Sequence, residues 1–190
     1  MRRLQLFLLL LCVALTCPAQ QTRQRGDGPD NFLEYSPYVA ACALKLCGVE
    51  SASSWKRLAV NGGLSWGIAA GTTWVLKHTV HSRRPDFSDN HSFPSGHSSI
   101  AFAGATILWK EYRHVSPWIG VAGYAVATYT AIDRIDRNKH HWFDVIAGAG
   151  IGIAATHVGY WLGDKITGSR SRSRYSVGVG PGGIAMAVRL

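Results

Sequence analysis

The residues of this sequence that could do chemistry lie in short polar stretches next to apolar segments. His140 and Asp144 are four residues apart at the start of one such segment, so the carboxylate can hydrogen-bond one imidazole nitrogen. The other nitrogen is then left as a nucleophile or base. His97 follows Ser95 and Gly96 directly before another segment. A Ser-Gly pair at a helix start offers a hydroxyl, free amides and the positive end of the helix dipole, which together predict an anion site.

Basic residues accompany these stretches. Lys77 and Arg84 follow one apolar segment, and Arg134 follows another. On a continuous helix Lys77 and Arg84 would be two turns apart and could point the same way before Pro85 ends it. Arg binds phosphate oxygens through two N–H groups, and Lys adds a point charge. Taken singly, each is also typical of a solvated helix end.

The pair of His140 and Asp144 could alternatively be half of a metal site, because histidine is a common ligand. Three cations expected on the same face would repel a metal ion. The sequence therefore predicts a phosphate-binding site with no metal.

Four apolar segments rich in Gly and Ala separate the polar stretches, at about residues 58–76, 98–109, 117–132 and 145–162. In an up-and-down bundle with short connections, alternate joints lie at the same end. The stretches around Lys77, His97, Arg134 and His140 therefore converge at one end of an all-α bundle. The joints at the opposite end carry charge but no comparable set of catalytic residue types.

Three of these segments, 58–76, 117–132 and 145–162, approach the length of a thin membrane span. Their small residues allow the close helix packing of membrane bundles. Hydrophobic residues make up 47% of the chain and charged residues only 16%, against about a quarter in soluble domains. The pattern favours a transmembrane bundle. A water-soluble bundle is the alternative, because 98–109 is short.

The two ends of the chain differ from this core. Residues 1–19 have the basic start, apolar run and small-residue cleavage site of a signal peptide. An uncleaved anchor and lipidation at Cys17 are alternatives. A polar lead-in (20–34), the catalytic domain (35–167) and a tail (168–190) follow, and two alternating runs in the tail predict a β-hairpin. Cys42 and Cys47 are expected to be buried thiols and not a disulfide.

The formal net charge is +9, from 20 basic and 11 acidic residues. Such a balance suits an anionic partner, which could be nucleic acid, an anionic membrane surface or a phosphorylated substrate. The sequence contains no nucleic-acid-binding motif, and its basic residues cluster in joints between apolar segments. A phosphorylated substrate at a membrane is therefore predicted, and nucleic acid is not.

Three motifs occur in a fixed order. They are Lys77, six residues, Arg84-Pro85; Pro94-Ser95-Gly96-His97; and Arg134, five residues, His140, three residues, Asp144. Together they resemble the three-part signature of the type 2 phosphatidic acid phosphatase superfamily, whose fold is shared with vanadium haloperoxidases. The resemblance covers about residues 56–163. Asp133 departs from it, because the family usually has a small residue there, and a carboxylate at this position could tune Arg134.

The resemblance implies a lipid phosphate phosphatase that needs no cofactor. His140 would attack phosphorus and become phosphohistidine, Asp144 would hold its other nitrogen, and His97 would protonate the leaving oxygen. The phosphoryl oxygens would be held by Lys77, Arg84, Ser95, Gly96 and Arg134.

The expected substrate is a lipid-like phosphomonoester or diphosphate, such as phosphatidic acid, phosphatidylglycerol phosphate, an isoprenyl diphosphate or a lipid A phosphate. The predicted signal places the site on the periplasmic or exterior side of a membrane. The alternatives are a soluble secreted acid phosphatase, a non-catalytic protein that binds lipid phosphates and a haloperoxidase. The last is disfavoured because such family members are much longer chains.

Overall fold

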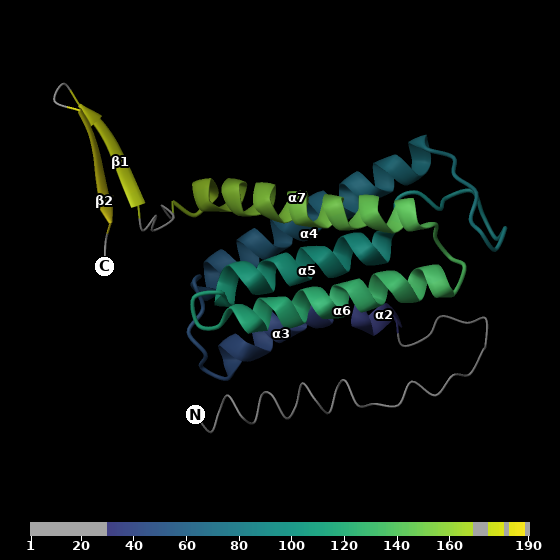
Figure 1. The fold of residues 1–190 in the computed structure, drawn as a ribbon, viewed down its shortest axis with the longest axis horizontal. Helices are drawn as coiled ribbons and strands as arrows, with labels where there is room; N and C mark the ends of the chain where they lie inside the picture. The colour runs from purple at the N-terminus through teal and green to yellow at the C-terminus, as the bar shows by residue number, and fades with distance from the viewer. Residues whose placement is uncertain (1–29, 169–174, 181–182, 189–190) are drawn as a thin grey trace.

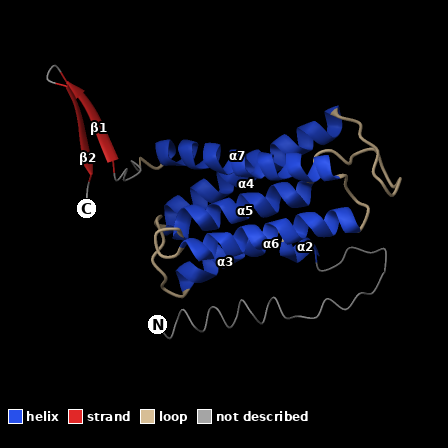
Figure 2. Ribbon diagram, viewed as in Figure 1, coloured by secondary structure: helices blue, strands red, loops and turns tan. Residues whose placement is uncertain are grey.

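The computed structural model describes residues 30–168, 175–180 and 183–188. The predicted signal peptide and most of the polar lead-in lie outside these residues. The chain forms the helical bundle shown in Figures 1 and 2, which confirms the predicted all-α class. Its helices are α2 (Asp30–Leu33), α3 (Ser36–Leu46), α4 (Trp55–Thr79), α5 (Gly96–Tyr112), α6 (Pro117–Asp136) and α7 (Trp142–Ile166).

The helix ends follow capping residues, and not the limits of the apolar segments. Ser54 and Ser95 cap α4 and α5, and each hydroxyl accepts a backbone N–H from three residues on. Pro117 begins α6, and a capping box between His141 and Asp144 begins α7. Each of the four long helices therefore extends beyond the apolar segment from which it was predicted.

Helices α4 to α7 run alternately up and down the bundle (Figure 1). Helix α5 lies at the centre and packs against α3, α4, α6 and α7. The α4–α5 and α6–α7 connections meet at one end, where Ser95 N donates to Asp144 O at 2.9 Å and Lys139 Nζ to Asp86 Oδ2 at 2.8 Å. The predicted convergence of these two joints is confirmed.

Glycines on one face of α7 bring three helices into close contact. A Cβ at Gly148 would run into the carbonyl oxygen of Ser95 on the α5 side. A Cβ at Gly159 would lie 2.6 Å from the backbone nitrogen of Ser65 in α4. Small residues at these positions let the helix backbones approach, which no larger side chain would allow. The contact at Gly148 also holds the start of α5 against α7.

We expect Gly152→Ala to destabilise the bundle by about 1–3 kcal/mol, the usual cost of overpacking. Its Cβ would run into the carbonyl oxygen of Ser99 and lie 2.8 Å from the backbone nitrogen of Ala103, so α5 and α7 would have to separate. Gly150→Ala on the same helix is the control, because its Cβ would meet nothing within 4 Å. Thermal unfolding of the detergent-extracted variants compares the two, and equal shifts would contradict the packing argument.

Within residues 30–168, α7 is the one helix that is both long and apolar enough to cross a bilayer. Helices α4 and α6 have the length, at 25 and 20 residues, but not the apolarity. In the tail, β1 (Tyr175–Gly180) and β2 (Gly183–Val188) pair antiparallel.

Cys42 and Cys47 are free thiols. The prediction of burial is wrong for Cys47, which is exposed, whereas Cys42 is half-buried. The reason is that α3 ends at Leu46, so Cys47 is the C-cap of the helix and lies outside its packed face.

Candidate active site

A pocket of about 360 Å³ lies at the end of the bundle where the α4–α5 and α6–α7 connections meet. It gathers side chains from the four stretches that the alternation of up and down helices predicts, and Glu34 adds a fifth part of the sequence. Six of the eight predicted site residues line it: Lys77, Arg84, Gly96, His97, Arg134 and His140. Ser95 and Asp144 are buried beside them and do not line the pocket.

Arg84 reaches the pocket from a loop and not from a helix. The expectation that it lies two turns beyond Lys77 on one helix is wrong, because α4 ends at Thr79. Asp89 holds Arg84 instead: Arg84 Nε donates to Asp89 Oδ1 at 2.8 Å, and the backbone N–H of Arg84 donates to the carbonyl oxygen of Asp89 at 3.0 Å. Lys77 Nζ donates to the carbonyl of His91 at 2.8 Å. The loop therefore brings the two cations to the same pocket.

We expect Asp89→Ala to raise KM about tenfold with a smaller change in kcat, because a hydrogen bond to a charged group contributes about 1.5–3 kcal/mol. Without the carboxylate, Arg84 loses the partner that orients it before substrate arrives. Asp136→Ala is the control, since Asp136 is exposed at the end of α6 at the same end of the bundle. Steady-state kinetics on one phosphate ester compares them; a KM that stays unchanged in Asp89→Ala would show that Arg84 is held by other contacts.

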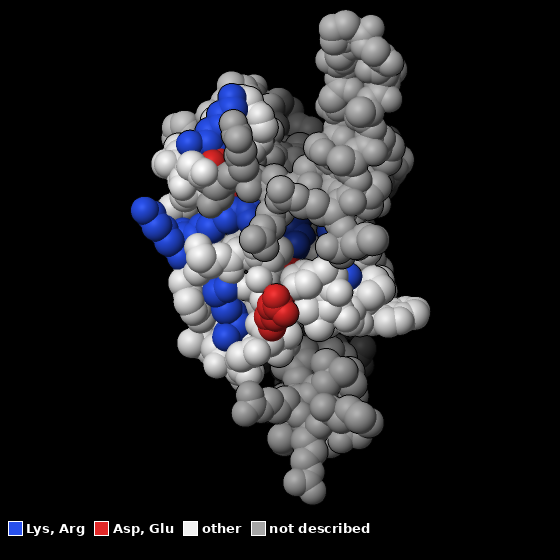
Figure 3. Space-filling view, turned by 90° about the vertical axis from the view of Figure 1, so that its left-hand side faces the viewer, with Lys and Arg blue, Asp and Glu red and all other residues white. Residues whose placement is uncertain are grey.

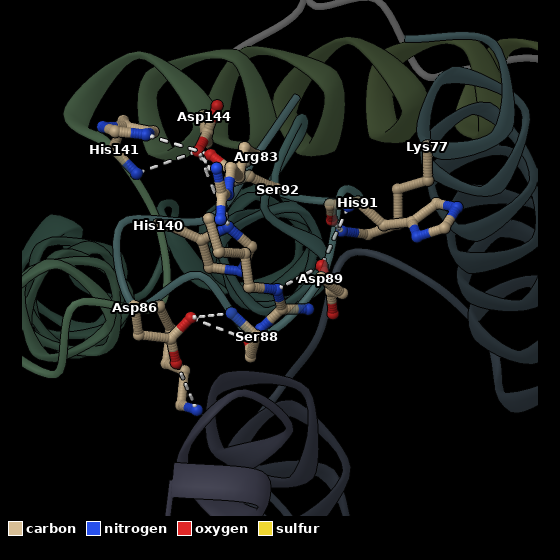
Figure 4. Close-up of polar contacts among 12 residues, drawn as sticks. Lys77, Arg83, Asp86, Ser88, Asp89, His91, Ser92, His140, His141 and Asp144 are labelled. Carbon is tan, nitrogen blue, oxygen red and sulfur yellow. Dashed lines mark hydrogen bonds and ion pairs between the residues drawn. The ribbon is translucent and has the colours of Figure 1, made fainter. Parts of the chain in front are cut away.

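The pair of His140 and Asp144 is buried, with Nδ1 and Oδ2 3.8 Å apart. That separation is an ion-pair distance and is longer than the direct hydrogen bond that was expected. Ser92 lies with them: its hydroxyl donates to Asp144 Oδ2 and is 3.5 Å from His140 Nδ1 (Figure 4). His141 N also donates to Asp144 Oδ2, at 2.8 Å. The carboxylate is thus fixed by two donors beside the imidazole.

The electrostatics of the pocket keep His140 neutral. The pKa of His140 is lowered to about 3, mainly by burial and also by the positive charges of Lys77, Arg84 and Arg134, while Asp144 opposes the shift. Because the folded-state pKa lies far below 7, the ring carries no proton on its second nitrogen at neutral pH. A neutral imidazole with one nitrogen free is the form that can attack an electrophile.

The start of α5 supplies the second histidine. Ser95 is the N-cap, and its Oγ accepts from Ser98 N at 3.4 Å and from Ser98 Oγ at 3.1 Å. Gly96 is the first residue of the helix, so its amide belongs to the positive end of the dipole. His97 Nε2 lies 3.9 Å from Glu34 Oε2. The candidate proton donor and the candidate anion-binding amide thus come from one helix terminus.

Arg134 closes the pocket from the last turn of α6, and its carbonyl accepts from His140 N at 3.3 Å. The helix end therefore positions the candidate nucleophile as well as the cation. Asp133 forms an ion pair with Arg137 one turn on, at 3.0 Å.

Two residues of the site were missed in the sequence. Ser92 stands in the same polar stretch as His97, but a serine in a loop carries no spacing signal. Glu34 falls at the last position of the polar lead-in, outside the predicted catalytic domain, yet it lines the pocket.

Positive charge alone does not mark the site. Lys and Arg side chains also gather at the end of the bundle away from the pocket, which faces the viewer in Figure 3. Lys56, Arg113 and Lys165 are exposed there. What distinguishes the pocket is that its cations surround two histidines and an adjacent buried carboxylate.

The sequence pattern of the PAP2 superfamily matches residues 5–167 of the chain. A lipid A 1-phosphatase of Porphyromonas gingivalis is 38% identical over 138 residues, which are 72% of this chain and 31% of that protein. A putative phosphatidate phosphatase of Drosophila melanogaster is 40% identical over 86 residues, or 38% of this chain and 22% of that protein. The chain thus spans less than a third of the length of either relative.

Among solved structures, the crystal structure of Aquifex aeolicus LpxE has a similar fold. It superposes with a TM-score of 0.53 at 21% sequence identity, over 80% of this chain and 93% of that one.

Proposed function

Because the chain belongs to the PAP2 superfamily, we propose that it hydrolyses a phosphomonoester or diphosphate of a lipid-like substrate through a phosphohistidine. The observation that carries this proposal is the pocket itself. It surrounds two histidines with three cations, and one of those histidines is buried and neutral. Lipid phosphate binding alone would need the cations but neither the neutral imidazole nor its carboxylate.

In the first step a substrate phosphate binds to Lys77, Arg84 and Arg134, and the Gly96 amide completes the cradle while Ser95, predicted to bind phosphate, holds the start of α5 as its cap. His140 Nε2 donates its lone pair to phosphorus while the bond from phosphorus to the leaving oxygen breaks. His97 gives its proton to that oxygen, so the alcohol or phosphate leaves neutralised. Phosphoryl transfer depends mostly on such positioning and on charge stabilisation.

In the second step water attacks the phosphohistidine. His97, now neutral, accepts a proton from the water, and the bond from phosphorus to Nε2 breaks. Inorganic phosphate leaves, and both histidines return to their starting states. Asp144 stabilises the positive charge that His140 carries while it bears the phosphoryl group.

The proposed reaction uses no metal ion. Lys77, Arg84 and Arg134 line the pocket and would repel a divalent cation from the place where the phosphate binds. They also supply the positive charge that a metal supplies in other phosphatases.

Phosphate release from a panel of lipid phosphates, with and without chelator, tests the proposal. The substrates to be compared are phosphatidic acid, phosphatidylglycerol phosphate, an isoprenyl diphosphate and lipid A. We expect release from at least one of them, unchanged by chelator, together with acid-labile phosphate on the protein. Release that stops with chelator would refute metal independence, and binding without any release would favour a non-catalytic protein.

We further propose that the protein spans a membrane and binds its substrate there. Trp55 and Trp74 on α4, and Trp142 and Trp161 on α7, are exposed tryptophans, and the two members of each pair are nineteen residues apart. At about 1.5 Å per residue the pairs span about 28 Å. That matches the roughly 30 Å of a bilayer core, at whose two borders tryptophan is enriched. Trp74 and Trp142 lie at the pocket end, so the pocket would open at one border.

We place that border on the periplasmic or exterior side. An export signal at residues 1–19 would deliver the following segment across the membrane, and Glu34, fifteen residues after Ala19, lines the pocket. A membrane-impermeant maleimide applied to intact spheroplasts should label Asn90→Cys in the exposed pocket-end loop but not Cys47 at the other end. Labelling of Cys47 but not of Asn90→Cys would show that the pocket faces the cytoplasm.

A further inference from the structure

Glu34 is a buried carboxylate that the reaction described above does not use. It lies in the turn between α2 and α3, with its side chain 9% exposed and lining the pocket. Its Oε2 is 3.9 Å from Nε2 of His97, on α5. An acidic group kept from water costs free energy unless it has partners, so its place beside a histidine calls for a function.

We propose that Glu34 is a positioning residue that holds His97 as an imidazolium aimed at the leaving oxygen. This inference rests on the proposed function, because it concerns the proton donor of that reaction. A carboxylate near an imidazole stabilises the charged ring and orients it. Glu34 thus acts through His97 and does not touch the substrate.

The charges around the pocket explain why such a partner is needed. Lys77 from α4, Arg84 from the α4–α5 loop and Arg134 from α6 all line the pocket that the two histidines also line. Each disfavours a further positive charge on His97, just as each lowers the pKa of His140. The two histidines need opposite protonation states for the first step. Burial keeps His140 neutral although Asp144 lies beside it, whereas the side chain of His97 is 25% exposed and has Glu34 beside it.

The net effect of the surroundings is to raise the pKa of Glu34, and two neighbours limit that rise. Burial raises the pKa of Glu34, whereas a hydrogen bond from the side chain of Tyr35 and the charge of Arg134 lower it. His140, also in the pocket, is neutral and adds no charge. At a separation of 3.9 Å, Glu34 and His97 therefore interact as a pair whose protonation states depend on each other.

The test compares two esters of the same chain length, one of a fatty alcohol and one of a fatty-chain nitrophenol. The nitrophenolate leaves without a proton, so only the alcohol ester needs the acid. A positioned acid contributes about 10²- to 10⁴-fold, and we expect Glu34→Gln to lose about 10- to 100-fold in kcat/KM on the alkyl ester. The loss on the nitrophenyl ester should stay within about threefold. His97→Ala should show the same selective pattern with a larger loss.

The pH profile gives a second reading. His97 must be protonated to act, so kcat/KM on the alkyl ester falls as pH rises through the pKa of His97. Removing the negative charge lowers that pKa, so the alkaline limb should move to lower pH in Glu34→Gln. Glu34→Asp should restore part of the shift. Glu50→Gln, at an exposed glutamate beyond the other end of α3, is the matched control and should behave as wild type.

Equal losses on the two esters, or an unmoved alkaline limb, would show that Glu34 only supports the fold and would overturn the inference. Thermal unfolding of Glu34→Gln and Glu34→Asp shows whether each variant folds. If one of them does not fold, the kinetics of the other one test the inference. Wild-type protein that hydrolyses neither ester would overturn the proposed function and this inference together. Wild-type turnover with non-selective losses would overturn the inference alone.

Discussion

Replacing His140 with alanine should reduce phosphate release by about 10⁴-fold or more, because the change removes the atom that forms the covalent intermediate. His140 is buried at the pocket, and its low pKa keeps it in the attacking form. The remaining cations would still bind the substrate, so KM should change far less than kcat. Initial rates of phosphate release from a lipid phosphate, and acid-labile phosphate on the protein after rapid quenching, measure the two effects.

His114→Ala is the matched control, since His114 is exposed just beyond the C-terminal end of α5, at the other end of the bundle. It should keep nearly all the activity and still acquire acid-labile phosphate. Similar losses in the two variants would mean that the site has been placed at the wrong end. Loss of turnover in His140→Ala with phosphate still bound to the protein would mean that another residue is the nucleophile.

The helical bundle, and the end of it at which the site lies, could be predicted from the sequence because they depend only on the apolar segments and on their order. Apolar segments of helical length define the elements, and the alternation of up and down helices assigns each joint to an end. His97 at the start of α5 and His140 just before α7 therefore had to meet the stretch that follows α4. Knowledge of the side-chain contacts was not needed for that step.

The details that the sequence did not predict belong to loops and to the chain ends. Arg84 was assigned to a helix because its spacing from Lys77 suits one, but the helix stops at Thr79 and the loop folds back so that Asp89 can bind Arg84. Glu34 lies in a stretch whose composition is that of a linker. Its place in the pocket depends on how the turn before α3 packs against the bundle, for which a polar sequence carries no periodic signal.

The second large effect is expected from Asp144→Asn, which keeps the shape of the side chain and removes its charge. Asp144 is buried, its Oδ2 is 3.8 Å from His140 Nδ1, and Ser92 and His141 both donate to that oxygen. Without the charge, nothing offsets the positive ring that forms when His140 takes the phosphoryl group. We expect kcat to fall by about 10²- to 10⁴-fold, as for other carboxylates that orient a catalytic histidine. An asparagine oxygen can still accept the His141 N–H, so the cap of α7 should survive and the unfolding temperature should change little.

A second variant, Ser92→Ala, distinguishes whether Asp144 acts by its charge or by orienting His140 through Ser92. If the carboxylate acts mainly by its charge, removing the hydroxyl should lower kcat only about tenfold, the effect of one hydrogen bond. If Ser92 instead relays orientation from Asp144 to Nδ1, both variants should fall alike, and the double variant should lose no more than either single one. An Asp144→Asn variant that keeps kcat within about threefold of wild type would contradict both readings, because the nucleophile would then need no charged partner. Measuring all three variants on one ester, at a pH well above the pKa of His140, compares them with the nucleophile in the same neutral form.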